Sequence, residues 1–318
     1  MRKISGRDIF SNSCEKNNVL SNYFLFSPFS ILDTSAAVWQ KRKRQWINLG
    51  IKSELGRTAK TFDIADWLQV QGRGNLSDTS IFDPVLCELM YRWFCKDGGK
   101  ILDPFAGGSV RGITASKLGF NYTGIELRKE QVDENISQSN DICKTNVPMY
   151  ICGDSNKELD ELTDGEFDFI FSCPPYADLE IYSDHIDDIS NKNYDEFLQL
   201  YSSIINKSIK KLNDNRFAAF VVSEVRNSKT GIYRNFVSDT INCFINSGCD
   251  YYNEIILMNV LGSLPSRVGK QFSVSRKIGR RHQNILIFVK GDPKLAVSDM
   301  GIPTSLVDDE ITLDTFFN

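Results

Sequence analysis

One stretch of this sequence, residues 101–118, restricts the possible folds more than any other. Apolar residues lead into Asp103, a turn containing Gly107 and Gly108 follows, and a helix-like apolar run continues to Leu118. In such a strand–turn–helix unit, glycine lets a ligand approach the backbone, and the helix N-terminus points its free N–H groups at the same place. The stretch therefore predicts a ligand pocket at the carboxyl edge of a parallel sheet.

A glutamate at the end of the next predicted strand indicates the class of ligand. Residues 122–125 form this short strand, and Glu126 follows it. An acidic side chain at this position can accept hydrogen bonds from both hydroxyls of a ribose. Because the glycine spacing does not match the G-x-G-x-x-G fingerprint, we expect a nucleoside pocket and not a dinucleotide site. A glycine turn alone is often only a turn, so a second motif is needed.

The second motif lies further along the chain. The buried-strand pattern of residues 167–171 ends in Ser172-Cys173-Pro174-Pro175-Tyr176. Two consecutive prolines hold the backbone rigidly and remove two N–H donors. Such a turn leaves carbonyl groups facing outward with an aromatic ring beside them.

The two motifs together carry a resemblance to a known family. Asp103-Pro104-Phe105-Ala106-Gly107-Gly108 resembles the S-adenosylmethionine loop of the amino-methyltransferases that act on DNA. Cys173-Pro174-Pro175-Tyr176 is similar to the catalytic loop of the same enzymes. The resemblance covers residues 79–293, and the wider sequence is similar to DNA methylases carried by bacteriophages and prophages.

This resemblance implies a function and a set of site residues. It implies transfer of a methyl group from S-adenosylmethionine to the exocyclic amine of a DNA base, adenine favoured over cytosine, as in restriction-modification. The implied cofactor-binding residues are Asp103, Phe105, Gly107, Gly108, Glu126 and Asp154, the last through the amine of the cofactor's adenine. The implied catalytic residues are Cys173, Pro174, Pro175 and Tyr176. As a plain loop aspartate, Asp154 would need no ligand.

An amine target explains the second motif apart from its cysteine. The amine lone pair is delocalised into the base, so acceptors must hold the N–H groups while the lone pair turns towards the methyl donor. The Pro174 carbonyl can supply one acceptor, and Tyr176 would stack on the base. In the family, the residue before the prolines supplies another acceptor, and Cys173 is a weak one. Either backbone carbonyls suffice, or Ser172 contributes, or the amine is not the target.

Three alternative functions stay open. Cys173 could attack a pyrimidine carbon as a thiolate with Glu224 as the acid, although such enzymes place the cysteine after a proline. The substrate could be RNA, because the chemistry of the site is shared. The chain could also bind S-adenosylmethionine without catalysis.

The order of strand and helix patterns predicts the fold class. Strands and helices alternate from Thr79 to Ile245, and strand patterns at 251–260 and 284–289 follow. They predict a doubly wound, mostly parallel α/β sheet of the methyltransferase (Rossmann-like) type, with one antiparallel strand near its end. The expected domains are an N-terminal extension (1–76), the S-adenosylmethionine-dependent methyltransferase domain (77–293) and a C-terminal tail (294–318), with a linker signal at 72–75.

Composition limits the partners and the location of the chain. A net charge of −4 argues against bulk electrostatic binding to nucleic acid, so any such surface must be a local patch. The eight cysteines form no C-x-x-C pair and no metal spacing with the two histidines. This predicts reduced thiols, no metal and a cytoplasmic protein of a bacterial or phage-infected cell. Neither a signal peptide nor a membrane span is expected.

Two segments are candidates for the basic patch. Residues 39–46 read as a helix with a basic face, and a solvated face over packed Trp39 and Trp46 is favoured over a phosphate contact. The second segment, residues 261–282, carries no acidic residue and predicts a flexible loop that binds DNA, with a solvated basic loop as the alternative. Its cations are Arg267, Lys270, Arg276, Lys277, Arg280 and Arg281.

An acidic stretch follows the second motif, over residues 177–193. Its carboxylates show no regular ligand spacing, which favours a solvated loop over a metal site.

Overall fold

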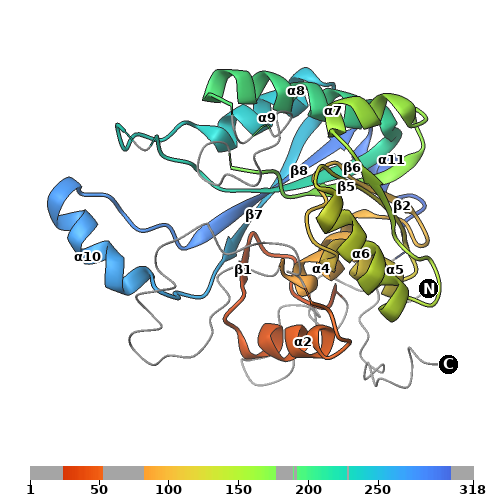
Figure 1. Ribbon diagram of the computed structural model, residues 1–318, viewed down its shortest axis with the longest axis horizontal. Coiled ribbons are helices and arrows are strands. Elements are labelled where there is room, and N and C mark those ends of the chain that lie inside the picture. The colour runs from red at the N-terminus through yellow and green to blue at the C-terminus, as the bar shows by residue number, and fades with distance from the viewer. Residues whose placement is uncertain (1–23, 53–81, 177–188, 190–191, 228, 302–318) are drawn as a thin grey trace, which may run out of the picture.

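The computed structural model describes residues 24–52, 82–176, 189, 192–227 and 229–301, which form one sheet with helices on both faces (Figure 1). The strands are β1 (Ile31–Asp33), β2 (Lys100–Asp103), β3 (Asn121–Glu126), β4 (Met149–Cys152), β5 (Phe167–Ser172), β6 (Leu212–Val222), β7 (Asp250–Met258) and β8 (His282–Lys290). The helices are α2 (Ala37–Ile47), α4 (Pro84–Phe94), α5 (Val110–Lys117), α6 (Lys129–Ile142), α7 (Ser155–Glu158), η1 (Leu159–Glu161), α8 (Tyr194–Lys211), α9 (Phe236–Asn246), α10 (Leu264–Ser275) and α11 (Pro293–Ala296).

The sheet has the predicted fold class. Its eight strands lie in the order β1-β7-β8-β6-β5-β2-β3-β4. Neighbouring strands are parallel, except that β8 runs antiparallel to both β6 and β7. The predicted fold class, a doubly wound and mostly parallel sheet with an antiparallel strand near its end, is therefore confirmed.

Alternating apolar side chains along β5 fill both faces of the sheet. Phe169 and Phe171 belong to the hydrophobic cluster under α4 and α5, whereas Ile170 belongs to the cluster under α8 and α9. All three side chains are fully buried. Since successive strand residues point to opposite faces, this pattern buries β5 on both sides.

The N-terminal segment adds β1, a strand that was not predicted, in parallel beside β7. The helix α2 then packs on α4 through two buried tryptophans. The indole N–H of Trp39 donates to Asp83 at 3.1 Å, and that of Trp46 donates to Glu88 at 2.8 Å. The packed Trp pair is confirmed, but Arg42 on the predicted basic face is buried in an ion pair with Glu88.

The main correction in secondary structure concerns residues 261–282, which were predicted as a flexible loop. Residues 264–275 form the helix α10, with Pro265 in its first turn and Arg276 in the left-handed region after its end. Proline suits the first turn because its fixed φ is already helical and its missing N–H would have no partner there. No side chain of α10 is buried, and Figure 1 shows it projecting from the body of the molecule.

Some predictions concern residues outside the described ranges. The linker signal at 72–75, most of the acidic stretch at 177–193 and the tail from residue 302 lie there, so these stay predictions, as do the domain boundaries. Within the described ranges, no helix is long and apolar enough to cross a membrane. In the same residues, no group of three or more His, Cys, Asp or Glu side chains is placed to hold a metal ion.

Candidate active site

The glycine turn and the end of β3 come together as predicted. Gly107 takes a left-handed φ of 52°, its N–H donates to Glu126 Oε2 at 3.0 Å, and its carbonyl accepts from Asn135 at 2.7 Å. The other Glu126 oxygen accepts from the Arg128 N–H at 3.0 Å. Because each carboxylate oxygen can accept more than one hydrogen bond, Glu126 retains capacity for hydroxyl donors beside the turn.

Gly107 and Glu126 come together because the backbone of the turn approaches the backbone of β3 closely. Gly124 in β3 lies against the turn, where a Cβ would come 2.8 Å from the Cβ of Ala106. The Ala106 N–H donates to the Ile125 carbonyl at 2.9 Å, which joins the turn to the strand. Glycine inside a strand often marks such an approach, and this signal was present in the sequence but was not used.

Asp103 lies beneath the turn, fully buried, and its carboxylate accepts four hydrogen bonds from within the chain. The donors are Arg111 Nε at 2.5 Å, the Tyr122 hydroxyl at 2.7 Å, the Phe105 N–H at 3.1 Å and the Ser172 hydroxyl at 2.6 Å. These donors occupy the carboxylate, so Asp103 organises the pocket from below. Its direct contact with a cofactor stays a prediction.

Arg111, which was not singled out from the sequence, ties the turn to this carboxylate. Its Nη2 donates to the carbonyls of Phe105 at 2.6 Å and Ala106 at 2.8 Å, and its guanidinium lies 4.5 Å over the Phe82 ring. Burial works against the charge, but Asp103 raises the pKa of Arg111 well above its ordinary value. The guanidinium is therefore a permanent cation that compensates the buried aspartate.

Other residues predicted to bind the cofactor also have roles in the fold. The ring of Phe105 packs 6.0 Å from that of Tyr201. Asp154 caps α7 by accepting from the Asn156 N–H at 2.9 Å, a role that needs no ligand. Gly108 lies partly buried in the turn. Contacts of these residues with a cofactor stay predictions.

The Pro-Pro loop begins at the end of β5, beside β2. Ser172 is fully buried with its hydroxyl turned to Asp103, so this single hydrogen bond of 2.6 Å links the two sequence motifs. The Ser172 hydroxyl thus joins two strands as a donor, and its lone pairs keep the capacity to accept a hydrogen bond. Pro174 is buried and Pro175 is partly buried, which keeps the loop close to the sheet edge.

Tyr176 is held by two separate elements. Its hydroxyl accepts from Gln283 Nε2 of β8 at 2.9 Å and lies 3.9 Å from the Cys173 sulfur. Its ring packs edge-on against Phe236 of α9, with the ring centres 6.2 Å apart. Gln283 was not predicted, because only the pairing of distant strands brings it to the loop.

The Glu224 carboxylate accepts a hydrogen bond from the first turn of α9, the helix whose Phe236 ring Tyr176 contacts. Glu224 follows β6, and its Oε1 accepts from the N–H of Val237, the residue after Phe236, at 3.3 Å. Its Oε2 is buried and has no hydrogen-bond partner among the described residues. A buried acceptor without a partner costs about 1–3 kcal/mol, a cost that a donor reaching this oxygen would remove.

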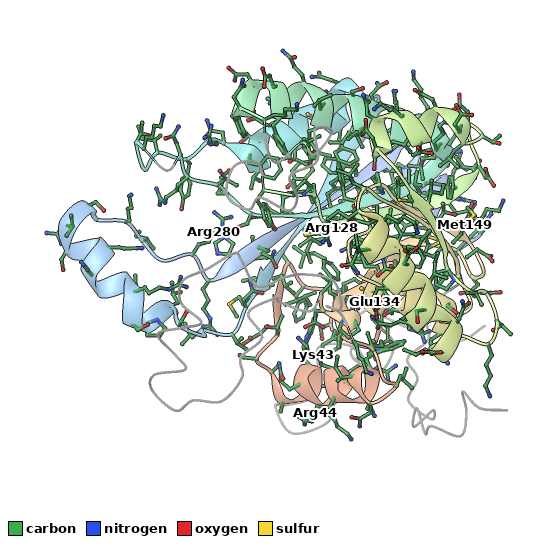
Figure 2. The ribbon with its side chains drawn as sticks, viewed as in Figure 1. Lys43, Arg44, Arg128, Glu134, Met149 and Arg280 are labelled. Atoms are coloured by element: carbon green, nitrogen blue, oxygen red, sulfur yellow. The ribbon has the colours of Figure 1, made fainter. Side chains whose placement is uncertain are left out.

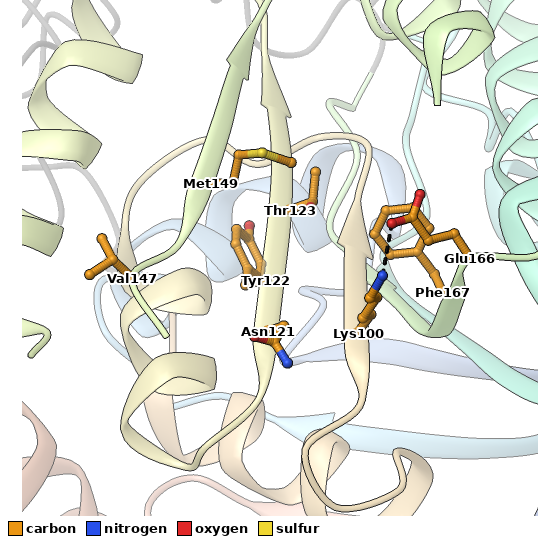
Figure 3. A pocket seen from close by; sticks show the side chains of 8 residues that line it. All are labelled: Lys100, Asn121, Tyr122, Thr123, Val147, Met149, Glu166 and Phe167. Carbon is orange, nitrogen blue, oxygen red and sulfur yellow. Dashed lines mark hydrogen bonds and ion pairs between the residues drawn. The ribbon is translucent and has the colours of Figure 1, made fainter. Parts of the chain in front are cut away.

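A hollow of about 200 Å³ opens at the amino ends of the strands, opposite the end that carries the glycine turn (Figure 3). Lys100, Asn121, Met149 and Phe167, the first residues of β2 to β5, line it. Lys100 forms an ion pair with Glu166 there at 2.9 Å. Because ligands of doubly wound sheets bind beyond the carboxyl ends of the strands, this hollow is not the candidate site.

The predicted nucleic-acid-binding cations divide into two groups. Arg267, Lys270 and Arg276 are exposed on α10 and at its end, whereas Lys277, Arg280 and Arg281 are partly buried. Arg280 donates to the Asn284 side chain at 2.5 Å, and Figure 2 shows it where the chain returns from α10 to β8. Arg281 donates to the Asn259 carbonyl at 2.9 Å. The first group faces solvent, and the second anchors the segment.

Comparison with known proteins finds similarity in fold. No family model and no curated protein matches the chain. The TrmN protein of Thermus thermophilus aligns with 66% of this chain and 49% of its own, at 11% identity and a TM-score of 0.42. A second Thermus thermophilus protein, assigned as a DNA modification methylase, aligns with 44% of this chain and 51% of its own, at 18% identity and a TM-score of 0.33.

A third solved structure is ChlM, the magnesium protoporphyrin IX methyltransferase of Synechocystis PCC 6803, with bound SAM. It aligns with 78% of this chain and 90% of its own, at 11% identity and a TM-score of 0.41. The alignments span about half the length of TrmN and of the methylase. At such low identities these likenesses concern the fold and carry no information on the substrate of this chain.

Proposed function

We propose that this chain transfers a methyl group from S-adenosylmethionine to the exocyclic amine of a DNA base, with adenine favoured over cytosine. The hydrogen bond of 2.6 Å between Asp103 and Ser172 carries the proposal, because it joins the glycine turn to the Pro-Pro loop at one sheet edge. A cofactor at the turn and a base at the loop are then neighbours, and positioning two reactants in this way supplies much of the catalysis.

The glycine turn forms the cofactor side. Glu126 accepts the ribose hydroxyls, and Gly107 lets the cofactor approach the backbone at the N-terminus of α5. Arg111 and Asp103 hold the turn from below before the ligand arrives. S-adenosylmethionine supplies an electrophilic methyl group on a sulfonium.

The Pro-Pro loop and Glu224 form the base side. Tyr176 stacks on the base, and the Pro174 carbonyl accepts one amine N–H. Glu224 Oε2, a buried acceptor with no partner in the described part of the chain, accepts the second, so the weak acceptor Cys173 is not required. The amine lone pair is then free to attack: the nitrogen–carbon bond forms as the sulfur–carbon bond breaks. One amine proton passes to Glu224 or to water.

Methyl transfer to DNA and RNA in parallel tests this function. The purified chain is incubated with labelled S-adenosylmethionine and each nucleic acid, and the modified nucleosides are identified. Methyl on the amine of adenine or cytosine in DNA is the expected result. Label in RNA alone, label on a pyrimidine carbon, or cofactor binding without any transfer would contradict it and would select one of the three alternatives.

A further inference from the structure

A second basic segment lies near α10, outside the site described above. After β6 the chain enters a turn, residues 226–234, closed by an antiparallel bridge between Arg226 and Tyr233. The Asn227 side chain accepts from the Lys229 N–H at 2.9 Å within this turn. In Figure 1 this hydrogen-bonded turn projects from the sheet on the same side as α10.

The turn presents a cation stacked on an aromatic ring, beside an exposed aliphatic side chain. The Arg226 guanidinium lies 3.8 Å from the centre of the Tyr233 ring and donates to the Gly231 carbonyl at 2.9 Å. Ile232 is 68% exposed and Tyr233 is 37% exposed. Planar groups of this kind match the faces of nucleobases, and an exposed apolar tip suits insertion between them.

The turn and the α10 segment meet, and neither carries an acid. Residues 225–238 and 255–291 contain no Asp or Glu. Where the two segments meet, a Cβ on Gly231 would lie 2.5 Å from Lys277 Nζ, so the lysine ammonium rests on the turn. Neighbouring cations repel one another, and a bound polyanion relieves this repulsion.

One end of each segment lies close in the chain to a residue of the candidate active site. Arg226 comes two residues after Glu224, whose Oε2 has no hydrogen-bond partner among the described residues. Gln283, which donates to the Tyr176 hydroxyl at 2.9 Å, comes two residues after Arg281. A base stacked on Tyr176 would therefore lie near the places where the 226–234 turn and the α10 segment join the sheet.

We propose that the 226–234 turn and the α10 segment, residues 261–282, form the two sides of one binding surface for duplex DNA. Ile232 and the Tyr233 ring occupy the space that the target base leaves when it is extruded, and Arg226 and Lys229 contact the flanking phosphates. This inference rests on the proposed function. A duplex is favoured because extrusion opens a gap in a base stack that an apolar tip can fill, and a single strand needs no such filling.

The charge on the turn is tested by binding a fluorescent random-sequence DNA duplex to the full chain at several salt concentrations. Arg226→Gln combined with Lys229→Gln should lower the slope of log affinity against log salt by up to about 1.8, for two phosphate contacts. The control, Lys144→Gln with Lys210→Gln, removes equal charge from exposed positions near the amino ends of β4 and β6. Equal slopes for the two variants would overturn the inference.

The stacking contribution is tested by Tyr233→Ala. This change should weaken duplex binding about 5- to 150-fold with little change in the salt slope, because the lost contact is not with a phosphate. The affinity for a single strand of the same sequence should fall by a smaller factor. Unchanged duplex affinity, or an equal loss on the single strand, would overturn the assignment of a duplex. S-adenosylmethionine affinity, measured in each variant, shows that the fold is intact.

Failure of the proposed function and failure of the two-sided surface would give different results. The natural sequence would then transfer no methyl group to DNA, while the turn variants would still lose duplex affinity relative to the control. Normal methyl transfer with identical binding by the turn variants and the control would leave the proposed function in place and overturn the two-sided surface.

Discussion

The two sides of the candidate site are built in opposite ways. Around the glycine turn the chain buries an ion pair between Asp103 and Arg111, and all four hydrogen bonds to that carboxylate come from within the protein. On the other side, α10 buries no side chain and carries exposed cations. The first arrangement holds a small pocket in shape before a ligand binds, which limits the entropy lost on binding. The second is a solvated surface that, under the proposed function, would bind a polyanion by releasing counterions.

The largest expected effect is the loss of stability when the buried ion pair of Asp103 and Arg111 is broken. Asp103→Asn leaves Arg111 as a buried cation without its carboxylate and should destabilise the fold by about 3–5 kcal/mol. Asp133→Asn, which removes the exposed pair with Lys129, is the matched control and should change stability little. Urea denaturation of both variants provides the measurement. Equal stability of the two variants would mean that the turn is not held from below.

Glu224→Gln sharpens the comparison on the base side. The amide oxygen can keep the hydrogen bond from Val237, but an NH₂ group then replaces the unpaired Oε2 and offers a donor where an acceptor is required. Turnover should fall by about 10- to 150-fold, the equivalent of about 1.5–3 kcal/mol for a charge-assisted hydrogen bond. Steady-state kinetics measure the turnover, and calorimetry measures the affinity for S-adenosylmethionine. Unchanged turnover with unchanged cofactor affinity would remove Glu224 from the mechanism.

Glu126→Ala examines the cofactor side alone. Loss of a charge-assisted hydrogen bond to the ribose should weaken S-adenosylmethionine binding by about 1.5–3 kcal/mol. The salt dependence of DNA binding should not change, because Glu126 lies at the glycine turn and not on the basic segments. Calorimetry with S-adenosylmethionine is the measurement, and an unaltered affinity would withdraw the assignment of Glu126.

Neutralising the exposed cations of α10 examines the solvated side. The combined variant Arg267→Gln, Lys270→Gln and Arg276→Gln loses up to three phosphate contacts. The slope of log DNA affinity against log salt concentration should therefore fall by up to about 2.7. The free energy of unfolding should change by no more than about 0.5 kcal/mol per substitution, since these side chains are exposed. A large loss of stability, or an unchanged salt slope, would contradict the contrast between the two sides.

The smallest expected effect is that of Cys173→Ser. If the target is an amine, serine keeps the size and supplies a better acceptor, so turnover should stay the same or rise. If Cys173 is instead a nucleophile, serine is far less reactive near neutral pH without a base, and turnover should collapse. Methyl incorporation with nucleoside identification separates the two. A folded but inactive serine variant, with methyl on a pyrimidine carbon, would overturn the amine target.

Local patterns were sufficient to predict most elements that carry the site. The closeness of the glycine turn to Glu126 followed from a strand–turn–helix pattern and from the next strand along the chain. The antiparallel pairing of β7 and β8 followed from two adjacent strand patterns. Residues 261–282 were less predictable, because serine and glycine lower helix propensity while Pro265 begins a helical turn, and the two signals oppose each other.

The sequence by itself determined where the strands, the glycine turn and the Pro-Pro loop lie, because each depends on side-chain alternation or on backbone restrictions over a few residues. Only the tertiary structure decided that Asp103 joins Arg111 and Ser172, that Gln283 holds Tyr176, and that Lys277 rests on Gly231. Most of these contacts join residues from strands or loops far apart in the chain. They exist only because the sheet brings those elements side by side, and no local pattern encodes which strands become neighbours.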